Sequence, residues 1–239
     1  MKALEQALGT AVVANNERIH RVDTGRGNPR SLDGLVWHQR LVEQYPRIRA
    51  EWDAFVERNG RLPLIEDLIV EHQGNEGPWR AGILWSKGKP VRPMDAEFPA
   101  TITALRGIPG LRSALWSLME PGTELPEHTG PNAGMLRYHL GIRCNEDSAL
   151  QVGDTIVTYR DGEGVLFDDT APHAAWNRGS EPRITLFCEI ERPLDGYNAM
   201  MNRMVQRVIS LDSRYRNAPR RAAQWHRALN RGRSPSSGA

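Results

Sequence analysis

The stretch "MLRYHLGIRCNEDSALQVGDTIVTYRDGEGVLFDDTAPHAAWNRGSEPRITLFCEI", residues 135–190, decides the fold of this chain. Within it, apolar runs such as "TIVTY" and "GVLFD" alternate with turn-forming segments such as "CNEDS", "RDGEG" and "NRGSEP". Apolar runs bounded by glycine, asparagine, aspartate and proline are typical of β-strands joined by tight turns. The same alternation begins near Leu115 and ends near Pro193. It predicts an antiparallel β-sandwich or barrel.

A helical pattern precedes this β region. Apolar side chains recur every three or four residues, the period of one helix face, at Trp37, Leu41, Tyr45, Ile48, Trp52 and Phe55. The spacing predicts a single amphipathic helix that ends at the glycine and proline of "ERNGRLP", residues 57–63. We expect residues 1–72 to form a helical segment packed on a β core of residues 73–195. The first part of that core, 73–113, is rich in glycine and proline, which favours short strands and loops.

A basic helical tail is expected over residues 196–239. One face of the segment Tyr197–Leu211 is apolar, a second helix is expected near Pro219–Asn230, and the closing "RGRSPSSGA" is expected to be disordered. From Gly196 onward the chain has nine arginines and one acidic residue, a net charge of +8, although the whole chain carries only +2. This asymmetry indicates either an anionic partner, such as a membrane surface, or a basic tail that is merely solvated.

Composition is that of an ordinary soluble globular protein, with 39% hydrophobic and 25% charged residues among 239. No apolar run approaches the roughly 20 residues that span a bilayer, and the N-terminus does not have the form of a signal peptide. We therefore expect a cytoplasmic protein, peripheral to a membrane if the tail binds one, with no nucleic-acid partner. Cys144 and Cys188 have no metal-binding or redox spacing and are expected to be free, buried thiols.

Two of the expected strands carry charges on one face and only apolar side chains on the other. In "MLRYHLGI" the period of two places Arg137 and His139 on the same face, and in "RITLFCEI" it places Arg183 with Thr185 and Phe187. If both faces of each strand are buried, each arginine needs an anion, because an unpaired buried charge is costly. A small carboxylate ligand would meet that need. The alternative is that these faces point to solvent.

His128 and His173 each lie just beyond a turn at the edge of a β segment. Two neutral imidazoles with open positions suit Fe(II) and also Zn(II). Many non-heme iron sites add a carboxylate two residues after the first histidine, and here Gly130 stands at that place. Taken alone, the two histidines are equally compatible with ordinary surface or core positions.

Four separated blocks make the pattern specific: "PGTELPEHTGP" (121–131), "LRYHLGI" (136–142), "GVLFDDTAPHAAWN" (164–177) and "PRITLFCEIERP" (182–193). In this order and spacing they resemble the aspartyl/asparaginyl β-hydroxylase family of Fe(II)- and 2-oxoglutarate-dependent oxygenases. The resemblance covers roughly residues 76–195, and "RPLDGYNAMMNRMVQRVIS" (192–210) is similar to the tail of bacterial members. It implies a mainly β fold, a double-stranded β-helix (a cupin-like jelly roll) with N-terminal helices and a C-terminal helical tail.

The resemblance also assigns roles to residues. It implies that His128 and His173 bind iron as the two protein ligands, since glycine at position 130 is usual in the family. Arg183 matches the arginine that pairs with the distal carboxylate of 2-oxoglutarate, and the other co-substrate contacts fall on Ser117, Arg137 and His139. Asp169 matches an aspartate that could hold water beside the metal. The alternative for Asp169 and its neighbour Asp168 is a turn or cap after a strand.

The implied reaction consumes 2-oxoglutarate and O₂, releases succinate and CO₂, and hydroxylates an unactivated C–H bond. Members that act on growth-factor-like domains carry an arginine two residues before the one matched by Arg137, and here that position is Met135. An apolar residue there fits a less acidic substrate, such as an acyl chain or a natural-product intermediate. We expect an aspartyl/asparaginyl-like, natural-product or acyl substrate, carried by a small molecule, a peptide or a lipid. Two alternatives remain: a halogenase that uses the vacant carboxylate position, and a non-catalytic jelly-roll binding module.

Overall fold

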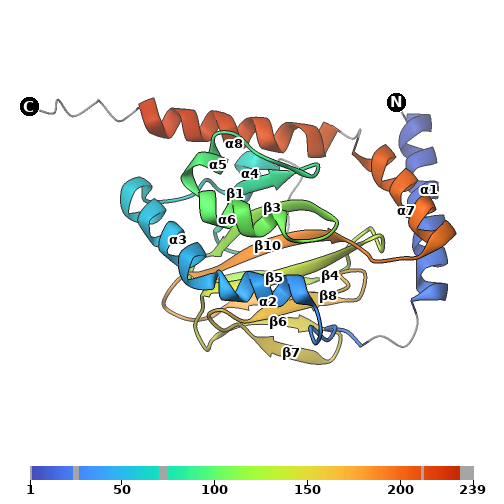
Figure 1. Cartoon of the computed structure of the whole chain (residues 1–239), viewed down its shortest axis with the longest axis horizontal. Coiled ribbons are helices and arrows are strands. Elements are labelled where there is room, and N and C mark those ends of the chain that lie inside the picture. The colour runs from blue at the N-terminus through green and yellow to red at the C-terminus, as the bar shows by residue number, and fades with distance from the viewer. Residues whose placement is uncertain (1, 24–26, 70–74, 211–212, 232–239) are drawn as a thin grey trace, which may run out of the picture.

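The computed structural model describes residues 2–23, 27–69, 75–210 and 213–231 (Figure 1). Its centre is two antiparallel sheets, one of six strands in the order β2-β1-β3-β10-β5-β8 and one of four in the order β4-β9-β6-β7. The strands are β1 Trp79–Ser86, β2 Lys89–Pro90, β3 Leu111–Met119, β4 Thr123–His128, β5 Met135–Arg143, β6 Ser148–Val152, β7 Thr155–Thr158, β8 Gly164–Phe167, β9 His173–Asn177 and β10 Arg183–Glu191. Strands distant in sequence pair within each sheet, as in the expected cupin-like jelly roll.

Helices cover the outside of the larger sheet and both of its flanks (Figure 1). They are α1 Lys2–Val22, α2 Val36–Glu43, α3 Tyr45–Asn59, α4 Ile65–Leu68, α5 Met94–Glu97, α6 Pro99–Arg106, α7 Gly196–Ile209 and α8 Ser213–Arg231. Within the described part of the chain, no helix is both long and apolar enough to cross a membrane. Cys144 and Cys188 are both free thiols, as expected. Cys188 is buried, but Cys144 is only partly buried, so the expectation of a buried thiol is wrong for Cys144.

The two faces of β5 and β10 behave as the alternation of their residues predicts. The apolar face, which includes Tyr138, Leu186 and Cys188, is buried in the main core against α2, α3 and Trp116 of β3. Trp52 of α3 packs on Trp116 with ring centroids 5.0 Å apart. The opposite face, with its arginines, points into a cavity. Both faces are therefore covered, and the solvent-facing alternative is wrong.

The single N-terminal helix expected over Trp37–Phe55 is wrong. The structure has two helices, α2 and α3, with Gln44 between them. Pro46 lies in the first turn of α3, where its missing N–H is harmless. Inside one continuous helix its ring would clash with the carbonyl of residue 42. The apolar stripe nevertheless survives the break, because Leu41, Ile48 and Phe55 are all buried in the same core.

The C-terminal helices are those expected, with shifted ends. Helix α7 ends at Ile209, before the expected Leu211, which lies outside the described residues. Helix α8 begins at Ser213, six residues earlier than the expected Pro219, which it includes. The segment 232–239, expected to be disordered, also lies outside the described residues. Helix α8 packs on α4 and β1, whereas α7 packs on α1.

Candidate active site

Every residue proposed for the site from the sequence lines one cavity of about 580 Å³. Strands of both sheets deliver them: Ser117 from β3, His128 from β4, Arg137 and His139 from β5, His173 from β9, Arg183 from β10, and Asp169 from the turn before β9. Residues up to 66 positions apart in the sequence thus meet because antiparallel pairing brings β3, β10 and β5 side by side. The cavity is the candidate active site.

The two histidines are direct cross-strand partners. His128 and His173 face each other in the β4–β9 register, and their ring centroids are 4.2 Å apart. The Nδ1 of His128 lies 2.8 Å from the carbonyl oxygen of Pro126, and the Nδ1 of His173 lies 3.0 Å from that of Ala171. A carbonyl only accepts, so each Nδ1 carries the proton and each Nε2 keeps its lone pair. This is the arrangement typical of metal-binding imidazoles.

Burial favours the neutral form of His173. It lowers the pKa of His173, although the hydrogen bond to the Ala171 carbonyl works in the opposite direction. Among the described residues, no group of three or more His, Cys, Asp or Glu side chains is arranged to hold a metal. The donors available to an ion at this point are therefore two imidazoles, a set that suits a metal with open coordination positions.

Gly130 is required by the Asp169 side chain. A Cβ at position 130 would lie 2.2 Å from Asp169 Oδ2 and 2.3 Å from its Cγ, far inside contact distance. The Gly130 N–H also donates to the Asp169 carbonyl at 2.6 Å. In a His-x-Asp motif, residue 130 would supply a carboxylate. Here the carboxylate of Asp169, in the turn before β9, occupies roughly the same space. Asp169 Oδ1 is buried and has no hydrogen-bond partner among the described residues.

Arg137 is held by two carboxylates. Its Nε donates to Asp169 Oδ2 at 2.8 Å, and its Nη1 donates to Glu189 Oε1. Glu189 also accepts from Ser113 Oγ. Glu189 was not among the predicted site residues, although the period of two along β10 places it on the same face as Arg183. That periodicity was the available signal.

Arg183 has no such carboxylate. It is 2% exposed, its Nε is buried without a hydrogen-bond partner, and among the described residues no carboxylate lies within ion-pair distance of it. Its guanidinium lies over the Tyr159 ring, 4.6 Å from the centroid. Tyr159 lies just past the end of β7, and no sequence pattern marked it as a site residue. The arrangement leaves a buried positive charge to be neutralised by a ligand.

His139 completes this end of the cavity. Its Nδ1 lies 2.6 Å from the Tyr159 hydroxyl, and its Nε2 is buried without a partner among the described residues. Burial, reinforced by the charges of Arg183 and Arg137, holds the pKa of His139 well below its usual value. Burial also raises the pKa of Tyr159 to about 12. A neutral imidazole that accepts from the tyrosine hydroxyl presents an Nε2–H donor to the cavity.

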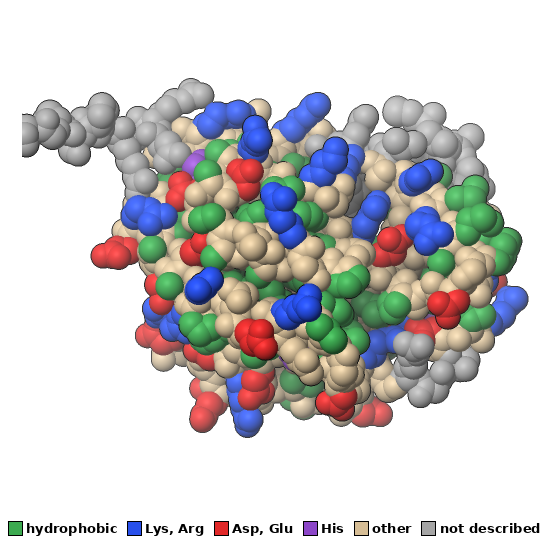
Figure 2. All heavy atoms as spheres, viewed as in Figure 1, with side chains coloured by type: hydrophobic (Ala, Val, Ile, Leu, Met, Phe, Trp, Pro, Cys, Tyr) green, Lys and Arg blue, Asp and Glu red, His purple; other side chains and the backbone are tan. Residues whose placement is uncertain are grey.

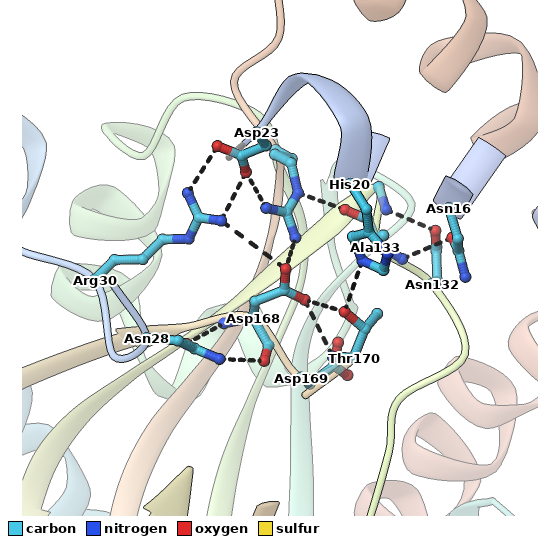
Figure 3. A network of polar contacts seen from close by, with 12 residues as sticks. Asn16, His20, Asp23, Asn28, Arg30, Asn132, Ala133, Asp168, Asp169 and Thr170 are labelled. Atoms are coloured by element: carbon cyan, nitrogen blue, oxygen red, sulfur yellow. Dashed lines mark hydrogen bonds and ion pairs between the residues drawn. The ribbon is translucent and has the colours of Figure 1, made fainter. Parts of the chain in front are cut away.

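A buried charge network fixes the turn before β9 (Figure 3). Arg192, which is 3% exposed, donates to both Asp23 and Asp168, and Arg30 donates to Asp23 at 2.6 Å. The amide of Asn28 pairs with the backbone of Asp168 in both directions, at 2.9 and 3.0 Å. Burial alone would raise the pKa of Asp168, but Arg192 and the hydrogen bonds from Thr170 outweigh it and hold that pKa below its usual value. Asp168 thus anchors the turn that presents Asp169.

The sequence of this chain is similar to those of known hydroxylases. A family model described as aspartyl/asparaginyl beta-hydroxylase matches residues 42–193. An ornithine lipid ester-linked acyl 2-hydroxylase from Rhizobium tropici is 31% identical over 191 residues, 77% of this chain and 68% of that protein. The human aspartyl/asparaginyl beta-hydroxylase is 30% identical over 64% of this chain. The matched region is only 21% of the human protein's length.

Solved structures with a likeness to this chain include cupins. One is the cupin domain of an XRE family transcriptional regulator from Enterobacter cloacae, with a TM-score of 0.34, 17% identity, and coverage of 48% of this chain and 98% of that one. The match to the family model extends over more than half of the chain and includes all of the cavity residues proposed from the sequence. The chain belongs to the aspartyl/asparaginyl β-hydroxylase family.

Proposed function

We propose that this protein is an Fe(II)- and 2-oxoglutarate-dependent oxygenase that hydroxylates an unactivated C–H bond of an acyl substrate. The observation that carries the proposal is one cavity that holds two imidazoles with unprotonated Nε2 atoms and a buried arginine without a carboxylate partner among the described residues. The imidazoles fit a metal and the arginine fits a dicarboxylic acid.

His128 and His173 would hold the iron through Nε2. Bound there with the 2-oxo acid and O₂, the metal would supply the oxidising chemistry that places one oxygen atom on the substrate and converts 2-oxoglutarate to succinate and CO₂. The residues of the chain bind and orient; none of them has to act as an acid or a base. The carbonyl groups of Pro126 and Ala171 fix the rings of His128 and His173, so that both Nε2 atoms stay directed at the cavity.

Three side chains would receive 2-oxoglutarate at the other end. Arg183 would pair with the distal carboxylate in a charge-assisted contact. Ser117 accepts from Trp79 Nε1 at 2.9 Å, so its own hydroxyl proton can be donated to a carboxylate. The Nε2–H of His139 would donate as well, because burial keeps this ring neutral. Arg137, whose charge is already compensated by Asp169 and Glu189, would contribute less to binding the dianion than Arg183.

Asp169 favours hydroxylation over halogenation. Its carboxylate stands where the side chain of residue 130 would begin. A negative charge at that place opposes a halide, whereas its unpartnered Oδ1 can accept from a water beside the metal. We therefore propose that Asp169 holds water there.

Much of the remaining cavity wall is apolar, which favours an acyl chain, although Lys87, Arg112 and Asn132 also line it. The apolar part includes Ile65, Ile69, Ile83, Leu115 and Met135. Met135, where the relatives that act on growth-factor-like domains have arginine, is only 5% exposed and offers no cation for a substrate carboxylate. The name of the Rhizobium tropici relative, an acyl 2-hydroxylase of a lipid, is consistent with this substrate class.

The proposed function is tested by anaerobic addition of Fe(II) and 2-oxoglutarate to the purified protein. A weak visible charge-transfer band is expected, followed by succinate formation when O₂ and an acyl substrate are supplied. A product heavier by one oxygen, in the presence of chloride, distinguishes a hydroxylase from a halogenase. Absence of the band in a folded protein would leave the non-catalytic binding module as the better reading.

Arg183→Met is expected to raise the 2-oxoglutarate KM by about 100-fold. The substitution keeps the volume and removes the charge, and the lost charge-assisted contacts correspond to about 3 kcal/mol. Steady-state succinate formation over a range of 2-oxoglutarate concentrations measures the effect. Arg178→Met is the matched control, because Arg178 is exposed and pairs with Glu124 outside the cavity. An unchanged KM in Arg183→Met would refute the co-substrate assignment.

Gly130→Ala is expected to reduce turnover by about 10- to 100-fold, the usual effect of displacing a partner of the metal environment. The added Cβ would push the Asp169 carboxylate away and loosen its contact with Arg137. Succinate production per enzyme measures the loss. Gly9→Ala serves as the control, because nothing lies within 4 Å of a Cβ at that position. Full activity in Gly130→Ala would show that the position of Asp169 is unimportant.

A further inference from the structure

Helix α7 exposes an apolar stripe to solvent. Tyr197, Met200, Met204 and Val208 are 64%, 46%, 54% and 42% exposed. Their spacing of three, four and four residues places them on one face of the helix. The opposite face, with Asn202, Val205 and Gln206, is buried against α1 and the loop that follows His128. Val13 of α1, 57% exposed, adds to the apolar surface at this end of the molecule.

The two C-terminal helices carry only positive charge, although Asp195 before α7 and Glu17 of the neighbouring α1 are exposed. The helices α7 and α8 contain eight arginines and no acidic residue. Arg203 and Arg207 are exposed beside the stripe, and Arg220 and Arg227 are exposed on α8. Figure 2 shows basic side chains along the upper edge, over α8, and hydrophobic side chains at the right-hand edge, over α1 and α7. An amphipathic helix with arginines beside an apolar face is the form that binds at the surface of an anionic bilayer.

The same two helices line the candidate active site. Gln206, Ile209 and Ser210 at the end of α7, and Ala218 and Pro219 of α8, belong to the cavity wall. The helix that carries the exposed stripe therefore also contributes to the cavity wall, and Ala218 of α8 packs with the apolar lining residues Ile65 and Ile83. A surface that met a bilayer here would bring lipid acyl chains next to that wall.

We propose that the α7 stripe, defined as Tyr197, Met200, Met204 and Val208 with the flanking Arg203 and Arg207, docks on an anionic phospholipid bilayer. This docking rests on the proposed function, in which the substrate is an acyl chain. A protein bound to a bilayer would meet lipid acyl chains at the membrane surface. A second copy of the chain is the less favourable occupant. A two-fold contact through α7 would bring the same arginines together, and neither α7 nor α8 has an acidic residue to pair with them.

Sedimentation of the full chain with vesicles tests the docking. The chain is expected to bind vesicles of phosphatidylcholine with phosphatidylglycerol, and to bind pure phosphatidylcholine much more weakly. Arg203→Gln with Arg207→Gln is expected to weaken binding by about 30-fold, at about fivefold per arginine. Met204→Glu is expected to weaken it by at least about 10-fold, because it removes apolar area and places a negative charge against the lipid. Raised salt should weaken the wild-type interaction.

Matched controls come from the other end of the molecule. Ile156 on β7 is 60% exposed, and Arg160 follows that strand with its side chain 72% exposed. Ile156→Glu and Arg160→Gln should bind vesicles like the wild type. If the wild type does not bind anionic vesicles, or if the controls lose binding as much as the α7 variants, the proposal is overturned. It is also overturned if the chain is a dimer in solution that Met204→Glu dissociates, since the stripe would then be a contact between copies.

Failure of the docking and failure of the proposed function can be separated. The Fe(II) and 2-oxoglutarate band does not depend on vesicles. A chain that gives the band but does not bind vesicles refutes the docking alone. A chain that binds vesicles through α7 but gives no band retains the docking surface and refutes the oxygenase.

Discussion

Replacement of either His128 or His173 by alanine is expected to abolish turnover and the Fe(II) band together. The two rings are the imidazole donors that face each other across β4 and β9, so loss of one leaves a single protein ligand. Removing an outer partner of a metal ligand typically costs about 10- to 100-fold, and removing the ligand itself should cost more. The measurements are anaerobic titration with Fe(II) in the presence of 2-oxoglutarate, and succinate formation.

A matched imidazole outside the cavity controls for general damage. His38 is partly buried, and its Nδ1 lies 2.9 Å from the Tyr138 hydroxyl on the outer, helix-covered face of the sheet. His38→Ala should keep both the band and the turnover, with some loss of stability. If His128→Ala or His173→Ala still binds Fe(II) with unchanged affinity, the metal is held elsewhere and the assignment of the site is wrong.

Arg192→Met is expected to lower the free energy of unfolding by about 3–5 kcal/mol, the usual cost of breaking a buried ion pair from one side. Arg192 joins Asp23 and Asp168, and its removal leaves the Asp168 carboxylate with much less positive charge around it. Urea unfolding followed by circular dichroism measures the change. Because Asp168 anchors the turn that presents Asp169, the fraction that remains folded should also show lower activity.

An exposed ion pair provides the comparison for this variant. Arg178 and Glu124 lie 2.8 Å apart with side chains 59% and 42% exposed. Arg178→Met should cost at most about 1 kcal/mol, because solvent screens such pairs. Equal effects of the two substitutions would mean that burial adds nothing to the Arg192 network.

The sequence predicted most of the β core because its signals are local. Alternation with period two identifies which face of β5 and β10 carries charge, and the resemblance of the four motif blocks to the family assigns roles to His128, His173 and Arg183. Glu189 could have been found by extending the alternation along β10. The eight-residue strand β1 was only partly foreseen, since its surroundings are rich in glycine and proline.

Contacts between remote segments were beyond such local signals. Nothing near Asp23 or Asn28 indicates a partner 140 or more positions away at Asp168 and Arg192. The contribution of α7 and α8 to the cavity wall could not be predicted either. An amphipathic pattern predicts that one helix face is buried, but not which segment it packs against. Pro46 indicated that a helix could begin near Gln44. The apolar spacing continues across this position, however, and it favoured one helix.

The charge network at Asp168 determines whether the segment matched by the family model, residues 42–193, can fold correctly without the residues before it. The family match begins at residue 42, whereas Asp23, Asn28 and Arg30 lie before it. A fragment of residues 42–193 would retain Asp168 and Arg192. It would lose their partners, which are the carboxylate of Asp23, the amide of Asn28 and the guanidinium of Arg30. The segment that contains Asp23, Asn28 and Arg30 therefore supports the barrel from outside the family match. A fragment cut at the family boundary would have an unsupported turn beside the His128–His173 pair.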